Sequence, residues 1–129
     1  MAELLAPGIT GEVEMTVGRT DTAVALGSGS VEVLATPAMI ALMEKAALTS
    51  VEPFLNAGQT TVGVSVNVRH LSPTPVGMKV RARSELMAVD GRRLVFKVFA
   101  YDEKEMVGTG THERYVVDTD RFLDRAMKK

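Results

Sequence analysis

Residues 34–55, LATPAMIALMEKAALTSVEPFL, decide the fold that we predict for this chain, because they carry its strongest helical signal. The Thr36 hydroxyl can cap a helix, and Pro37 suits the first helical position, where no backbone donor is needed. From residue 38 to residue 48 the segment is apolar almost all round, which is typical of a helix buried on every side. It is too short to span a bilayer, which needs roughly 20 apolar residues. We therefore expect a buried central helix.

Glu44 interrupts the apolar run of this helix. A carboxylate in an apolar site must be neutralised, paired or hydrogen-bonded, because desolvation penalises its charged form. Such a group has the chemistry of a general acid or base. The alternative is a glutamate at the helix edge that reaches water beside Lys45. The helix alone leaves both interpretations open.

Length and composition restrict the class of protein. The 129 residues suit one domain, 1–129, and the formal net charge of −1 gives no basic excess for nucleic-acid binding. The chain has no cysteine, which excludes disulfides and thiolate sites and fits a cytoplasmic protein. Its acidic N-terminus has no long apolar stretch, so we expect neither a signal peptide nor a membrane partner. Two histidines are too few for a histidine-rich metal cage, and we expect no metal.

Alternating apolar and polar residues predict strands around this helix. Residues 18–32 are rich in Gly, Ser and Thr and predict a loop, with room for a short strand at 23–26. A short amphipathic helix is expected from Asp118. We expect an α+β fold in which one antiparallel sheet wraps around the central helix. Its open edges favour pairing into a homodimer. The expected strands are 9–17, 60–70, 78–89, 94–101 and 106–117.

The strand over residues 60–70 predicts which face its side chains share. Strict alternation puts its valines on one face and its polar residues on the other. By the same parity His70 faces the helix with the valines, at the point where the strand becomes a loop. There it can act as base, acid or cation, or be a core histidine bonded to a backbone carbonyl. His112 is flanked by charged residues, and we expect it to face outward or toward a neighbouring strand. The valines are Val62, Val64, Val66 and Val68, and the polar set is Thr61, Gly63, Ser65, Asn67 and Arg69.

Thr36 also has two interpretations. It is either a helix cap or a catalytic hydroxyl, which needs an adjacent base. Thr36 and Glu44 are eight residues apart, roughly 12 Å along a regular helix, so a single helix does not place both on one atom.

Several separated segments together resemble the fluoroacetyl-CoA thioesterase family of hot-dog-fold acyl-CoA thioesterases. They are residues 35–44 (ATPAMIALME), Gly63, His70, residues 89–94 (VDGRRL) and residues 108–114 (GTGTHER). The likeness covers about residues 34–116. The resemblance implies a hot-dog fold and a homodimer, possibly a higher oligomer, with active sites at the subunit interface.

The resemblance also implies roles for particular residues. The catalytic residues would be Thr36, Glu44 and His70, and the substrate-binding residues would be Gly63, near the thioester carbonyl, and Arg114. No metal and no separate cofactor are implied, since CoA is part of the substrate. The fluoroacetyl-selective member has a bulky aromatic gate before the helix. Residues 28–32 (SGSVE) lack one here, so we expect a more open, less selective acyl pocket.

The function we expect is therefore hydrolysis of a short or medium acyl-CoA to the free acid and CoA. A non-catalytic acyl-CoA-binding hot-dog protein is the main alternative, and a hydratase on the same fold is a weaker one. Basic residues could meet the CoA phosphates, although each could equally belong to a solvated strand face or turn. These residues are Lys79, Arg92 and Arg93.

Overall fold

The computed structural model describes residues 4–129. The five strands agree with the expected ranges to within one residue at each end, and the α+β prediction is confirmed. The elements in chain order are β1 (Thr10–Thr16), η1 (Arg19–Asp21), α1 (Ala23–Leu26), α2 (Thr36–Val51), η2 (Glu52–Phe54), β2 (Gln59–His70), β3 (Lys79–Asp90), β4 (Arg93–Asp102), β5 (Met106–Asp118) and α3 (Thr119–Met127).

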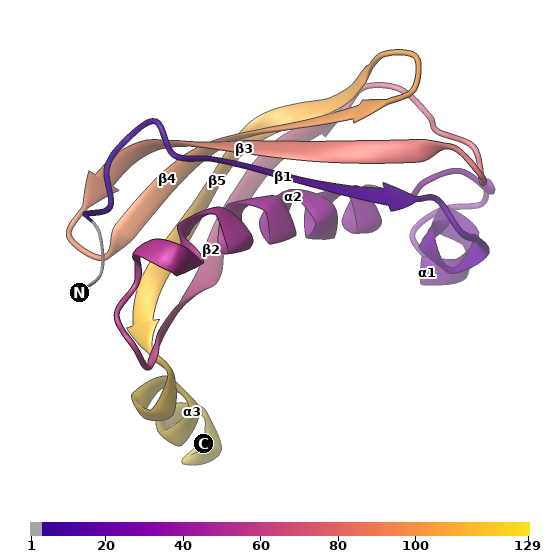
Figure 1. Ribbon diagram of the computed structural model, residues 1–129. Coiled ribbons are helices and arrows are strands. Elements are labelled where there is room, and N and C mark those ends of the chain that lie inside the picture. The colour runs from indigo at the N-terminus through magenta and orange to yellow at the C-terminus, as the bar shows by residue number, and fades with distance from the viewer. Residues whose placement is uncertain (1–3) are drawn as a thin grey trace.

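The strands form one antiparallel sheet in the order β1-β3-β4-β5-β2. The sheet curves around α2, which lies along its concave face (Figure 1). Consecutive strands β3, β4 and β5 form a meander, and Gly91, with φ of 60°, makes the turn between β3 and β4. Strands β1 and β2, which flank α2 in the chain, are the two edges. The sheet thus leaves β2, a strand of 12 residues, with an open side.

Helix α2 is less enclosed than its sequence predicts. Six of its residues are fully buried against the sheet, including Met39 and Met43. The opposite side is covered by nothing else in the described chain, and Ala41 and Lys45 are exposed. Between the two sides runs a half-buried stripe at i, i+4 spacing, made of Ile40, Glu44 and Leu48. The expectation of a helix buried all round is therefore wrong for one copy of this chain.

The predicted cap of α2 is also wrong. The helix begins at Thr36 itself, and the preceding residue, Ala35, has the extended N-cap conformation with no side-chain bond. Pro37 lies in the first turn, where its missing N–H costs nothing. The Thr36 hydroxyl is consequently free for a partner outside the helix.

The core lies between α2 and the inner face of the sheet. Phe96, Val98 and Ala100 of β4 are fully buried there, together with Leu86 of β3. Gly108 of β5 lies against α2, and a Cβ at this position would collide with the Met39 side chain. The glycine therefore allows the helix to approach the sheet closely.

A bulge in β2 changes the faces that strict alternation predicts. The register with β5 shifts between Gly63 and Ser65, so Val64 is the extra residue. Before the bulge, Thr61 is buried on the inner face. Gly63 is also on the inner face, beside Glu44. After it, Val66 stands opposite the buried His112.

The bulge corrects two sequence predictions. Val62 pairs with the outward Tyr115, so the four valines do not share one face. The predicted polar face is divided in the same way. His70 still projects toward the helix, because it lies beyond the bulge with Val66 and Val68.

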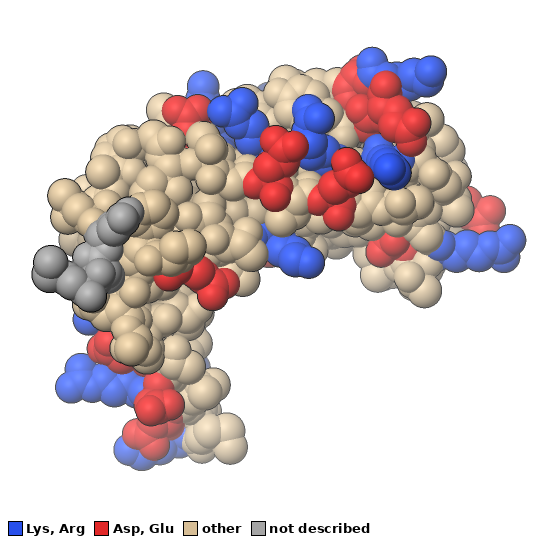
Figure 2. All heavy atoms as spheres, viewed as in Figure 1, with Lys and Arg blue, Asp and Glu red and all other residues tan. Residues whose placement is uncertain are grey.

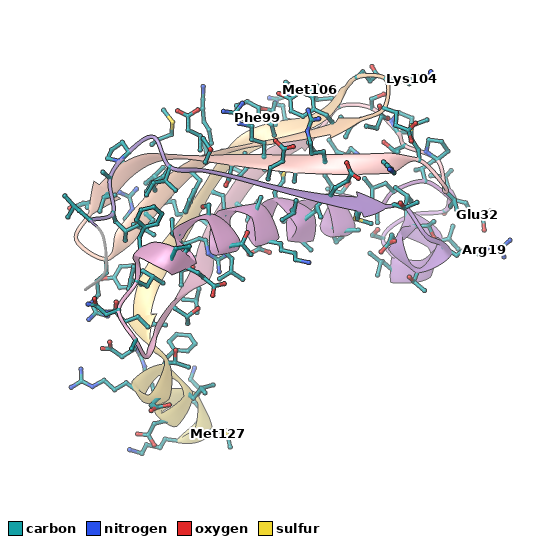
Figure 3. The ribbon with its side chains drawn as sticks, in the orientation of Figure 1. Arg19, Glu32, Phe99, Lys104, Met106 and Met127 are labelled. Atoms are coloured by element: carbon teal, nitrogen blue, oxygen red, sulfur yellow. The ribbon has the colours of Figure 1, made fainter. Side chains whose placement is uncertain are left out.

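The sequence predicted the C-terminal helix correctly but not the short helix that precedes α2. Residues 23–26 form the one-turn helix α1, capped by the Thr22 hydroxyl, and not the short strand we allowed for. The predicted C-terminal helix is present as α3. It projects from the end of β5 away from the sheet, with Met127 at its tip (Figures 1 and 3). Within residues 4–129, no helix combines the length and the apolar character that a bilayer crossing requires.

The outer face of the sheet is polar and mixed in charge. Phe99 and Met106 lie on the side of the sheet away from α2 (Figure 3). Acidic and basic side chains alternate across the face seen in Figure 2, and the ion pairs Lys79–Glu14 and Arg81–Glu12 join β3 to β1. This face offers no single-sign field to a charged partner.

Candidate functional site

Thr36 and His70 form the first functional group of side chains. Oγ1 of Thr36 lies 2.8 Å from Nδ1 of His70, which joins the start of α2 to the end of β2. Nε2 of His70 is buried and has no hydrogen-bond partner in the described part of the chain. Burial lowers the pKa of His70, against an opposing effect of the Ser72 backbone. The imidazole is therefore uncharged at pH 7, and its Nε2 is available for proton transfer.

An open cavity of about 380 Å³ adjoins this pair. Its walls come from α1, the 28–34 segment, the start of α2 and the loop after β2. No Phe, Tyr or Trp lines it among the described residues, in line with the open pocket expected from residues 28–32. The lining residues are Ala23, Ser28, Gly29, Val31, Val33, Leu34, Thr36, His70, Leu71, Ser72 and Pro73.

Glu44 is the centre of a second group, eight residues further along α2. Its Oε2 lies 3.6 Å from Nη1 of Arg114 and 3.9 Å from Nε2 of His112. The Glu44 side chain is 39% exposed, whereas those of Arg114 and His112 are almost completely buried. The carboxylate therefore has a fixed cationic partner behind it and remains open to solvent in front.

Gly63 lies directly against the same carboxylate. A Cβ at this position would stand 2.6 Å from Oε2 of Glu44 and about 3.5 Å from the His112 and Arg114 side chains. A glycine here leaves the Glu44 carboxylate in its present position, whereas any side chain would displace the end of the glutamate. The structure thus brings together Glu44, Gly63 and Arg114, three of the five site residues predicted from the sequence.

Arg114 is anchored by several bonds at once. Its Nε donates to Oγ1 of Thr61 at 2.8 Å, and its Nη2 donates to the Thr61 carbonyl at 2.9 Å. Burial lowers the pKa of Arg114, while Glu44 and Glu52 act in the opposite direction. A buried guanidinium held in this way presents its remaining N–H groups in fixed directions. Within this chain its role is to hold Glu44.

The position of His112 decides between the two directions that the sequence left open. The residue does not face outward but is 1% exposed, its ring stacks on Phe96, and its Nδ1 is bonded to the Ser65 carbonyl of the neighbouring strand β2. Its burial and the positive charge of Arg114 lower its pKa, against opposing effects of Ser65, Glu44 and Glu113. The signal that could have located it is the period of two in residues 108–114. Two glycines close to α2 or β2 at 108 and 110 put positions 112 and 114 on the same inner face.

The two groups do not meet within one chain. Helix α2 is continuous from Thr36 to Val51, so Thr36 and Glu44 are separated by roughly 12 Å along its axis. On β2, Gly63 and His70 are seven residues apart, or roughly 23 Å along an extended strand. The distance problem raised by the sequence is therefore real in the structure.

The basic residues considered as CoA-phosphate ligands form ion pairs on the surface. Each of the basic residues considered for CoA phosphates has an acidic partner: Lys79 pairs with Glu14, Arg92 with Asp118, and Arg93 with Glu113. Within residues 4–129, no cluster of three or more His, Asp or Glu side chains has the arrangement of a metal site.

Comparisons with known proteins show the family to which the chain belongs. The chain matches the family model for the fluoroacetyl-CoA-specific thioesterase FlK over residues 17–120. It is 39% identical, over 98 residues, to the fluoroacetyl-CoA thioesterase of Streptantibioticus cattleyicolor, covering 76% of this chain and 70% of that protein.

Solved structures match the fold over nearly its full length. A structure of fluoroacetyl-CoA thioesterase FlK superimposes with a TM-score of 0.93 at 32% identity and 98% coverage of both chains. A thioesterase superfamily member from Thermus thermophilus matches with a TM-score of 0.86 at 28% identity, covering 95% of this chain and 90% of that one. The hot-dog fold is thereby confirmed, and the named thioesterases among the homologues support thioester hydrolase activity. The chain belongs to the fluoroacetyl-CoA-specific thioesterase family.

Proposed function

We propose that this protein hydrolyses acyl-CoA thioesters to the free acid and CoA, with a short or medium acyl chain as substrate. The observation that carries the proposal is the Glu44 carboxylate, which is held by Arg114 against Gly63 and remains accessible. Family membership gives the reaction class. The open cavity beside Thr36 and His70 supports a wider range of acyl groups than fluoroacetyl alone.

Two features of this chain support a homodimer. Strand β2 has one open edge, and Val64 beside it is 57% exposed. The half-buried stripe of α2 (Ile40, Glu44 and Leu48) is likewise uncovered. An edge strand and an adjoining apolar helix face are the surfaces that a second copy would cover in one continuous interface.

Antiparallel pairing of two β2 strands would also assemble one site from the two groups. A two-fold axis through Asn67 pairs Val66 with Val68 of the partner, and because Val64 is the extra residue of the bulge, the same register brings Gly63 of one copy opposite His70 of its partner. Glu44, Gly63 and Arg114 of one copy would then face Thr36 and His70 of the partner. This arrangement removes the separation of roughly 12 Å that α2 imposes within one chain.

The residues then have chemical roles in hydrolysis. Glu44 either takes a proton from the attacking water or attacks the thioester carbonyl, forming an anhydride that water then opens. His70 supplies a proton to the departing CoA thiolate, and Thr36 orients the imidazole. Backbone N–H groups near Gly63 stabilise the oxyanion. In both routes one water is consumed, and the products are the acid and the CoA thiol.

The experiment is CoA release measured with a chromogenic thiol reagent, to which this cysteine-free chain adds no background. The panel is acetyl-, fluoroacetyl-, butyryl-, hexanoyl- and phenylacetyl-CoA. Glu44→Gln should lower turnover by about a hundredfold or more, on the scale of general-base catalysis. Absence of release from every ester, with the esters still bound, would replace the proposal with a non-catalytic acyl-CoA-binding protein.

Subunit mixing tests the shared site. Glu44→Gln and His70→Ala are each inactive, but a mixed dimer has one site in which both residues are intact. After complete subunit exchange of equal amounts, about a quarter of wild-type activity should return, since half the dimers are mixed and each has one working site. No recovery after demonstrated exchange would place both residues in the site from the same chain.

A further inference from the structure

We propose that His112 is a positioning residue, which fixes Arg114 and through it the Glu44 carboxylate by accepting a hydrogen bond at Nε2. The inference deepens the proposed thioesterase function and rests on it for its kinetic test. His112 is not among the site residues predicted from the sequence. Its position behind Glu44 is defined by two hydrogen bonds and by stacking on Phe96.

The partners of His112 determine its tautomer. Nδ1 lies 2.8 Å from the Ser65 carbonyl oxygen, and a carbonyl oxygen only accepts, so Nδ1 carries the proton. Nε2 lies 3.2 Å from Nη1 of Arg114, and a guanidinium only donates, so Nε2 is the acceptor. The ring is therefore a neutral imidazole with a single proton on Nδ1.

This tautomer decides what holds Glu44. Nε2 of His112 carries a lone pair toward Oε2 of Glu44, 3.9 Å away, so the two do not attract each other. The attraction comes from Nη1 of Arg114, which reaches both the His112 nitrogen and the Glu44 oxygen. His112 thus fixes the edge of the guanidinium that faces the carboxylate, while Thr61 fixes its other edge.

The bulge in β2 explains why the arrangement occurs here. The Ser65 carbonyl accepts the hydrogen bond from Nδ1 of His112, and Ser65 is the residue directly after the extra residue Val64. The bulge therefore aims one backbone acceptor at His112 and leaves Gly63 facing Glu44. Without the bulge, each residue of β2 after Val64 would point to the face of the sheet opposite to the one it occupies here.

Three substitutions separate the functions of the ring. His112→Phe keeps the shape and the stacking on Phe96 but removes both nitrogens. His112→Gln places an amide oxygen near the Nε2 position and can still accept from Arg114. His112→Asn places an amide N–H near the Nδ1 position and can donate only to Ser65. Thr111→Ala, an exposed neighbour on the same strand, is the matched control.

The kinetic result expected is a selective loss. His112→Phe and His112→Asn should lower kcat about tenfold, the equivalent of one lost hydrogen bond to a charged group, with KM little changed. His112→Gln should recover most of kcat, and the control should match wild type. Equal activity of the Gln and Asn variants, or wild-type kcat in the Phe variant, would overturn the inference.

Two NMR measurements test the inference without any turnover. The ¹⁵N spectrum of the imidazole should show the Nδ1–H tautomer, and slow exchange of the Arg114 Nη1–H, the group bonded to His112, should persist in His112→Gln and be lost in His112→Phe. An Nε2–H tautomer or an imidazolium at neutral pH would refute it. A wild-type protein that hydrolyses no acyl-CoA would instead refute the proposed function, while these spectra still decide the role of His112.

Discussion

Nδ1 of His70 and Oγ1 of Thr36 are 2.8 Å apart, although 34 positions separate them in the chain. The contact connects the first residue of α2 to the last residue of β2. Because Thr36 is the first helical residue and Ala35 is the N-cap, the threonine hydroxyl makes no capping bond and is available to the histidine. The hydroxyl thus orients the ring of a histidine whose other nitrogen has no partner within residues 4–129.

Removal of this hydroxyl should lower catalysis without unfolding the protein. Thr36→Val keeps the shape but leaves Nδ1 of His70 unbonded, and we expect kcat to fall about tenfold. Thr36→Ser retains the oxygen and should retain most of kcat. The measurement is CoA release at saturating acyl-CoA, with thermal unfolding as the control for folding. Equal kcat in the Val and Ser variants would contradict an orienting role.

A methyl group at Gly63 should affect the site and leave the fold intact. Gly63→Ala places a Cβ 2.6 Å from Oε2 of Glu44, and the end of that flexible side chain can move aside. We expect turnover to fall at least about tenfold, because the carboxylate is displaced from its productive position.

Gly110 provides the contrast, because a Cβ there would collide with the backbone of β2 at Asn67 and Val68. Gly110→Ala should lower the free energy of unfolding by about 1–3 kcal/mol, the scale of overpacking. Urea denaturation measures both variants. Destabilisation by Gly63→Ala as large as that by Gly110→Ala would show that Gly63 is required for folding and not for the position of Glu44.

The stability of the protein should fall as the pH falls through the range in which histidine titrates. Burial lowers the pKa of both His70 and His112 below 6.5, the value expected in the unfolded chain. Between the folded and unfolded values the unfolded chain binds more protons, so acid favours unfolding. The contribution of the two neutral histidines to the free energy of unfolding is fully present above pH 6.5. It is lost as the pH falls through the pKa values that the two side chains have in the folded protein.

This linkage is measured by the urea midpoint from about pH 7.5 to about pH 5.5 at fixed protein concentration. The range lies above the titration of the carboxyls of Asp102 and Glu113, whose pKa values are also lowered. His112→Gln should give a flatter dependence. A midpoint that stays constant or rises toward pH 5.5 would contradict the neutral, buried state of the two histidines.

A charge at the open edge of β2 should separate the proposed dimer. Val64→Glu places a carboxylate on a residue that is 57% exposed in one chain, so the monomer should still fold. In a two-fold interface two such charges would be buried, and we expect light scattering to report a monomer that has lost turnover. Thr111→Glu on the outer face is the control and should remain dimeric. A Val64→Glu protein that is dimeric and active would exclude β2 pairing.

Much of the fold was predictable from the sequence because its signals are local. The alternation of residues 78–89 predicted β3, which the structure confirms. Alternation failed where the strand register shifts, between Gly63 and Ser65 of β2 and between Leu86 and Ala88 of β3, because a bulge arises from the pairing of two strands and shifts every later side chain. The sequence also overestimated the burial of α2, because composition alone does not distinguish an apolar helix face that packs on the sheet from one that this chain leaves uncovered.

The candidate site was only partly predictable. The resemblance selected Thr36, Glu44, His70, Gly63 and Arg114, but not how they are grouped. For His112 the charged neighbours in the chain left two directions open, outward or toward a neighbouring strand, whereas its inward direction follows from the close packing of Gly108 and Gly110. Its two hydrogen-bond partners, Ser65 and Arg114, are positioned by β2 and β5 together.

A central helix, five strands in order, the family and the residue types able to carry out acid–base chemistry all follow from the amino-acid sequence. The pairing of Thr36 with His70, and the separate grouping of Glu44 with Gly63, His112 and Arg114, follow from the three-dimensional packing alone. The difference lies in the distance along the chain over which each interaction acts. Periodicity and turn chemistry act over a few neighbouring residues, whereas a hydrogen bond between elements depends on strand register, on one bulge and on the depth at which the helix packs.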